Sequence, residues 1–231
     1  MSSPDPTHPQ QDNPPSDNGT PDGNGGFPNA GFSASSLGET LRQLFWQYRK
    51  VLSQPGASTF VAELPKASWD SILTQLLLLS VVDAAILFLD QLLNIRTILS
   101  QILFIQHFAL PVILGFNLIA FFLWASLTHF VSRGFKGVGT YKDHCYSYAL
   151  ILVPVSIASG LLNFIPGIGV QLAALPGIYS FVLQVFMLMG VQRLSGSRAT
   201  VTVLLSSLIL IVLVVLLFII LDPNIGFNMG L

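Results

Sequence analysis

The sequence predicts an all-α integral membrane protein with five transmembrane helices. Of its 231 residues, 52% are hydrophobic and only 9% are charged, whereas soluble domains carry about 25% charged residues. The apolar residues gather in five runs of roughly 20 residues, the length that a helix rising ~1.5 Å per residue needs to cross a ~30 Å hydrocarbon core. The expected spans are residues 71–93, 109–131, 145–164, 171–192 and 200–221.

Composition excludes several other classes of protein. The net charge of -1 excludes a nucleic-acid binder that relies on bulk positive charge. Cys145 is the only cysteine, so the chain can form neither an intramolecular disulfide nor a thiolate metal cage. We therefore expect no cofactor, no metal and no nucleic-acid partner.

The N-terminal segment differs in composition from the rest of the chain. Residues 1–36 hold seven of the fourteen prolines, and Asn, Asp, Ser, Gly and Gln fill most of the remainder. Such a segment buries too little apolar surface to offset the entropy of ordering it. We expect a disordered tail, with a proline-rich ligand for a recognition domain as the functional alternative.

Residues 37–69 are expected to form an amphipathic helix and a linker. Apolar side chains recur at helical spacing in the first part, while the basic side chains lie largely off that stripe. A basic, aromatic helix either lies on an anionic bilayer surface or packs on the membrane domain, and the pattern leaves both open. The stripe consists of Leu37, Leu41, Leu44, Phe45, Tyr48 and Leu52, and the basic residues are Arg42, Arg49 and Lys50.

The first two spans are separated by a more polar stretch. The first span covers residues 71–93, and polar residues recur in residues 94–108. That stretch is expected to be an interfacial or re-entrant helix, with membership of the second span left open. Span two, residues 109–131, carries Pro111 in its first turn, where the missing N–H costs little. A charged loop, residues 132–144, follows it.

Spans three and four are expected to form a helical hairpin. The joining residues 163–169 are too few and too apolar for a soluble loop, and they carry no charge. Pro166, Gly167 and Gly169 are the expected structural residues of this turn. Glycine permits positive φ angles, and backbone groups at membrane depth must be bonded internally. Residues 223–231 are expected to be a short tail after span five.

The basic residues predict how the chain is threaded. With five spans, nine of the ten Lys and Arg residues fall on one face of the membrane, and only Arg96 falls on the other. The positive-inside rule makes the basic face cytoplasmic. We therefore expect a cytoplasmic N-terminus and a C-terminus outside. The nine residues are Arg42, Arg49, Lys50, Lys66, Arg133, Lys136, Lys142, Arg193 and Arg198.

Three segments carry a likeness to a known family. They are Pro-Gly-Ala-Ser-Thr-Phe at 55–60 with Glu-Leu-Pro-Lys-Ala-Ser-Trp at 63–69, the stretch from Gly137 through Tyr148 to Pro154, and Ile-Pro-Gly-Ile-Gly at 165–169. In these segments the chain resembles the Ypt-interacting protein (Yip) family of multi-pass membrane proteins, in its short prokaryotic form. The likeness covers roughly residues 45–220.

The resemblance implies five spans, a cytoplasmic N-terminus and a prokaryotic plasma membrane as the location. Eukaryotic relatives are associated with small GTPases and with the shaping or sorting of secretory membranes. They carry an Asp-Leu-Tyr-Gly-Pro motif before the first span. This sequence has no such motif, so binding of a small GTPase is not carried over to it.

Asp83, Asp90 and His107 are the candidate functional residues of the membrane domain. A carboxylate near the middle of a span costs on the order of 2.5–3.5 kcal/mol, so Asp83 should face the protein interior. Asp90 follows seven residues later, on nearly the same helical face. One hypothesis is a proton- or cation-coupled path lined by these carboxylates, with His107 as a partner. The structural alternative is a protonated Asp83 bonded to Asn117 or Gln184, with Asp90 solvated near the outer edge.

The sequence contains none of the motifs of an intramembrane enzyme. It has no His-Glu-x-x-His motif, and both aspartates lie on one helix. Gly137 and Gly139 lack the Gly-Lys-Ser/Thr ending of a phosphate loop, which indicates a turn. We predict a non-catalytic protein that scaffolds, sorts or organises membrane components, with the lipid bilayer and other membrane proteins or further copies of itself as partners. The alternative is a small transporter or channel subunit that uses the Asp83/Asp90 face.

The topology is directly testable. A reporter fused after Lys142 is expected to lie inside the cell and one fused after Met229 outside, because an odd number of spans separates an inside N-terminus from the C-terminus. Two reporters on the same side of the membrane would contradict the five-span topology.

Overall fold

The computed structural model describes residues 34–92 and 109–221, and within these ranges it consists of helices joined by turns. Five of the helices are long and apolar enough to cross a membrane, which confirms the predicted fold class. Before them come α1 (Ala34–Ser53), α2 (Ala57–Glu63) and the 3-10 turn η1 (Leu64–Lys66). The five are α3 (Trp69–Leu92), α4 (Ala109–Gly134), α5 (Tyr141–Leu162), α6 (Gly169–Val191) and α7 (Gly196–Leu221).

The ends of the spans differ from the predicted ones by at most four residues. α5 begins at Tyr141 rather than at residue 145, because Thr140 caps the helix. The Oγ1 atom of Thr140 accepts a hydrogen bond from the backbone N–H of Asp143 at 3.1 Å, which satisfies one of the free donors of the first turn. Since α4 also continues to Gly134, the loop predicted at residues 132–144 is much shorter.

The region before the first span is more helical than predicted. α1 begins at Ala34, so the tail predicted for residues 1–36 ends three residues too late. The expected linker contains α2 and η1, because Phe60 and Glu63, three residues apart on one face, are buried. Three other predictions fall on residues that the structure does not describe. They are the remainder of the N-terminal tail, the segment at 94–108 and the tail at 223–231.

α1 packs on the membrane domain through its second half. Tyr48 and Val51 are buried there. The Tyr48 hydroxyl donates to Oε1 of Gln75 in α3 at 3.3 Å, and the Tyr179 hydroxyl of α6 donates to the carbonyl oxygen of Leu52 at 2.6 Å. Of the two placements that the sequence left open, packing on the membrane domain is therefore present for this half of the helix.

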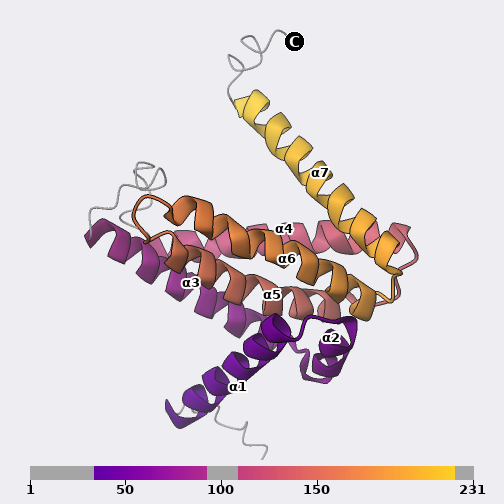
Figure 1. Ribbon diagram of the computed structural model, residues 1–231, viewed down its shortest axis with the longest axis horizontal. Coiled ribbons are helices and arrows are strands. Elements are labelled where there is room, and N and C mark those ends of the chain that lie inside the picture. Colours follow the sequence, from indigo (N-terminus) through magenta and orange to yellow (C-terminus); the bar gives the residue numbers. More distant parts are fainter. Residues whose placement is uncertain (1–33, 93–108, 222–231) are drawn as a thin grey trace, which may run out of the picture.

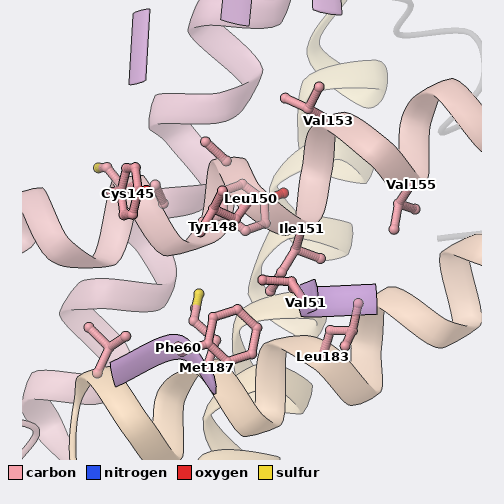
Figure 2. Packing of buried hydrophobic residues seen from close by; sticks show 14 of the residues in the cluster. Val51, Phe60, Cys145, Tyr148, Leu150, Ile151, Val153, Val155, Leu183 and Met187 are labelled. Carbon is pink, nitrogen blue, oxygen red and sulfur yellow. The ribbon is translucent and has the colours of Figure 1, made fainter. Parts of the chain in front are cut away.

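α5 lies at the centre of the bundle. It packs against α6, α3, α4 and α1, and all side chains of residues 144–151 are buried. Figure 1 shows α3, α4, α5 and α6 running along nearly the same direction, whereas α1 and α7 diverge from that direction. Figure 2 shows the core around α5, in which side chains of α1 and α2 reach those of α5 and α6. Its members include Val51, Phe60, Leu150, Ile151, Leu183 and Met187.

The turn between α5 and α6 is compact and internally bonded. Gly169 donates its backbone N–H to the carbonyl oxygen of Ile165 at 2.8 Å. Gly167, which follows the exposed Pro166, has a φ of 82°, in the left-handed region that side chains with a Cβ disfavour. A Cβ at Gly169 would lie 2.6 Å from the carbonyl oxygen of Asn163. The reversal of the chain therefore depends on both glycines.

Replacing Gly167 and Gly169 together by valine is expected to destabilise the protein and leave its topology unchanged. A left-handed conformation costs a residue with a Cβ roughly 1–2 kcal/mol, and forcing atoms into an occupied space costs about 1–3 kcal/mol. The midpoint of thermal unfolding in detergent should fall by more than about 5 °C.

Gly177→Val is the matched control, because a Cβ at Gly177 of α6 meets nothing within 4 Å. A double variant as stable as this control would mean that the turn does not depend on its glycines.

Candidate functional site

The Asp83 carboxyl joins α3 to α4. Asn117 of α4 donates one amide proton to Oδ2 of Asp83 at 2.9 Å and lies 3.2 Å from Oγ of Ser80. Ser80 and Asp83 are three residues apart, so both face α4. The Ser80 hydroxyl in turn donates to the carbonyl oxygen of Leu76 at 2.9 Å. This network gives a half-buried intramembrane carboxyl a polar partner, which offsets part of the cost of placing it there.

Of the other residues named with Asp83, only Gln184 has a side chain within the described part of the chain. Gln184, the second partner expected for Asp83, instead accepts a hydrogen bond from Nε1 of Trp124 at 3.1 Å, a bond that joins α6 to α4. The side chain of Asp90 and the whole of His107 lie outside the described residues. The part of the predicted path that the structure describes is therefore the Asp83–Asn117 pair.

A second polar cluster lies at the end of the bundle formed by η1, the α4–α5 turn and the connection from α6 to α7, which we call the basic end. Gln192, directly after α6, is fully buried there. Its Oε1 accepts the backbone N–H of Gly139 at 3.1 Å, so its amide nitrogen donates to Nδ1 of His129, also at 3.1 Å. The other ring nitrogen of His129, Nε2, lies 3.5 Å from Nε of Arg133.

His144 of α5 lies against the same cluster, with its ring centroid 5.5 Å from that of His129 and the two rings inclined at 60° to each other. Its Nε2 lies 2.8 Å from Oγ1 of Thr128. The Thr128 hydroxyl already donates to the carbonyl oxygen of Trp124 at 2.9 Å, so Nε2 of His144 is the donor. Nδ1 of His144 is then an acceptor, buried without a partner among the described residues. The two histidines thus join parts of the bundle: His129 joins α4 to the end of α6, and His144 joins α5 to α4.

The turn between α4 and α5 uses its backbone donors internally. The N–H groups of Gly137 and Val138 bond the carbonyl oxygens of Ser132 and Gln192 at 2.9 and 3.2 Å. The Arg133 guanidinium donates to the carbonyl oxygen of Gly137 at 3.2 Å. Because these donors point into the protein, the turn is not built to cradle a phosphate. This agrees with the sequence, which lacks the ending of a phosphate loop.

The cluster of His129, His144 and Gln192 was not predicted from the sequence. A signal was present, since the polar pairs His129/Ser132 and His144/Ser147 recur at a spacing of three in otherwise apolar helices. Which residue would complete the cluster could not be read from spacing, because Gln192 is 63 positions from His129.

Glu63, the last residue of α2, is buried between two lysines. Its Oε1 accepts a hydrogen bond from Nζ of Lys50 at 2.8 Å, and its Oε2 accepts one from Nζ of Lys66 at 2.6 Å. The carboxylate thereby joins α1 to η1. The space that a Cβ would need at Gly190 is occupied by the carbonyl oxygen of Ala57, so α2 lies directly on α6. These contacts attach the cap of α1, α2 and η1 to the bundle.

Burial raises the pKa of the Glu63 carboxyl, whereas the hydrogen bonds and charges of Lys50 and Lys66 lower it. The lowering effects together exceed the effect of burial, so the pKa lies below its ordinary value of 4.5. A folded-state pKa below the unfolded one means that the carboxylate stabilises the fold. This contribution is complete above the ordinary pKa and is lost as the pH falls through the lower folded value.

Glu63→Gln is expected to lower the midpoint of thermal unfolding in detergent at about pH 7. Between about pH 5 and pH 3, the midpoint of the variant should decrease less than that of the parent protein. Each bond to a charged group contributes about 1.5–3 kcal/mol, reduced here because both lysines are partly exposed. The measurement is a set of melting curves against pH. Glu39→Gln, at an exposed position of α1, is the control. If both variants follow the parent curve at every pH, Glu63 does not anchor the cap.

Comparison with known proteins agrees with this architecture. A family model, the Yip1 domain, matches residues 49–219, from α1 to α7 and well over half of the 231 residues. No curated protein and no solved structure matches the chain significantly. The matched region includes the buried Glu63, the α4–α5 turn and the turn that closes the α5–α6 hairpin. Five apolar helices in this order, together with that match, show that the chain belongs to the Yip1 domain family of membrane proteins.

Proposed function

We propose that the protein is a non-catalytic, multi-pass membrane protein that scaffolds, sorts or organises membrane components. One observation carries this proposal: its buried polar side chains bond across helices and thereby hold the bundle in one arrangement. Asp83 bonds Asn117 and His129 bonds Gln192, and Glu63 bonds two lysines. Polar groups that are used in this way support a rigid body whose outer surface carries the function.

The position of α7 supports lateral interactions within the membrane. Its first half packs on α4 and α6, through buried residues that include Ala199 and Val203. Large apolar side chains from Leu208 to Ile220 are exposed, and Figure 1 shows this half of the helix leaving the bundle. A helix in this position offers its sides for packing against another membrane protein or a second copy, since helices in lipid associate through close van der Waals contact.

The basic end is proposed to face the cytoplasm. Most of the basic residues outside α1 lie at this end, in or next to the connections before and between the spans, and the positive-inside rule places such residues on the cytoplasmic side. The N-terminus would then be cytoplasmic and the C-terminus outside. The basic residues at this end are Lys66, Arg133, Lys136, Lys142, Arg193 and Arg198.

Coupled transport through Asp83 is a second candidate. It is favoured by the position of this side chain, which is half-buried near the middle of α3, and by its hydrogen bonding, which among the described residues uses only Oδ2. A carboxyl at this depth with one oxygen that no described residue bonds is a typical site for proton or cation binding.

Asp83→Asn separates the two candidates. Under the scaffolding proposal, parent and variant purified in native lipid co-isolate the same membrane proteins in similar amounts, because asparagine keeps the shape and the bond to Asn117. Neither protein, reconstituted into liposomes, carries protons above the leak of empty liposomes.

Asp70→Asn, at an exposed position of the same helix, is the control for both measurements. A proton or cation flux that the parent and the Asp70 variant support and the Asp83 variant loses would establish the transporter instead. Failure of the parent to co-isolate any membrane protein reproducibly would contradict the scaffolding proposal.

A further inference from the structure

A groove of about 540 Å³ lies between α1 and α5. It follows from the divergence of α1 from the bundle, which Figure 1 shows. The second half of α1 is held by its buried side chains, and the groove opens beside it. One wall is formed by Phe45, Arg49 and Leu52 of α1, and the other by Pro154, Ala158 and Leu161 of α5.

The groove opens beside a helix that is long and apolar enough to cross a membrane. Its α5 wall belongs to the membrane-spanning segment Tyr141–Leu162, and its lining is almost entirely apolar. Water does not fill such a space, because it finds no polar partners there. An empty groove would also forfeit the van der Waals contacts of its walls. A fatty acyl chain is the component of a bilayer whose length, width and chemistry suit the space.

A cation stands at the same groove. The guanidinium of Arg49 lies over the ring of Trp46, 5.1 Å from its centroid, and no ion pair joins Arg49 to a described residue. Its neighbour Lys50 is engaged by Glu63. Arg42 is exposed seven residues earlier, on nearly the same face of α1. A guanidinium is suited to phosphate oxygens, which it binds through two parallel N–H donors, and tryptophan is typical of the membrane interface.

We propose that the groove binds one anionic phospholipid, with an acyl chain between α1 and α5 and the lipid phosphate on Arg49. The apolar walls recognise the chain and the arginine recognises the head group. The site would thus make the position of α1 dependent on the lipid composition of the membrane.

Native mass spectrometry of the full-length protein in detergent tests this proposal, with dioleoyl phosphatidylglycerol as the probe and dioleoyl phosphatidylcholine as the chain-matched neutral lipid. One phosphatidylglycerol molecule should bind in preference to phosphatidylcholine. Arg49→Gln should weaken that binding about tenfold or more, the effect of losing bonds to a charged group. Arg198→Gln, an exposed cation at the start of α7, should not.

Ala158→Phe is designed to fill the groove and should reduce the binding of both lipids, whereas Ala174→Phe on the exposed face of α6 should leave binding unchanged. Equal affinity for the two lipids, or equal loss in the Arg49 and Arg198 variants, would overturn the proposal. So would undiminished binding to a folded Ala158 variant.

A phosphatidylglycerol with a photoreactive acyl chain tests the same site in the parent protein, whether or not the Ala158 variant folds. Cross-links to the peptide that carries Pro154 and Leu161 support the groove. Cross-links spread evenly over the lipid-facing helices, without enrichment in this peptide, contradict it.

Discussion

Polar groups in the membrane-spanning part of this chain must find partners inside the protein, because hydrocarbon offers none. Much of the bundle can be understood from this constraint. Hydroxyl groups bond carbonyl oxygens four residues earlier in their own helix, as those of Ser80 and Thr202 do. The longer polar side chains reach across to another helix, as Asn117 does to Asp83 and Trp124 does to Gln184. The helices are thereby fixed in register by a few directional bonds, while their lipid-facing surfaces remain apolar.

The basic end follows the same rule with more polar residues. Gln192 bonds His129 and the α4–α5 turn, and the ring of His129 contacts that of His144, which lies within bonding distance of Thr128. The cap is attached beside this set by Glu63 and its lysines, and by the close approach of Ala57 to Gly190. Polar bonds therefore hold this end of the bundle, whereas apolar packing around α5 holds its middle.

A bundle that uses its polar groups for its own cohesion has its outer surface left for interactions. In this member of the Yip1 domain family, that surface is widened by the two helices that diverge, α1 and α7. α7 presents its C-terminal half laterally, and α1 leaves beside α5 an apolar groove with an arginine on its wall. Both features suit a protein whose work consists of contacts with lipids and other membrane proteins rather than of chemistry at a catalytic centre.

The sequence by itself determined the membrane class, the five spans and the turn at Gly167 and Gly169. These depend on the length of apolar runs and on backbone conformations that glycine permits, which are local properties. It also indicated that Asp83 needs a partner and named two residues, of which tertiary packing chose Asn117. Only the tertiary structure decided that Glu63 is buried between lysines and that Gln192 completes the histidine cluster. It also decided that α1 packs on α5 with a groove beside it. These contacts join residues far apart in the chain, and their formation depends on how the helices are oriented, which no local periodicity specifies.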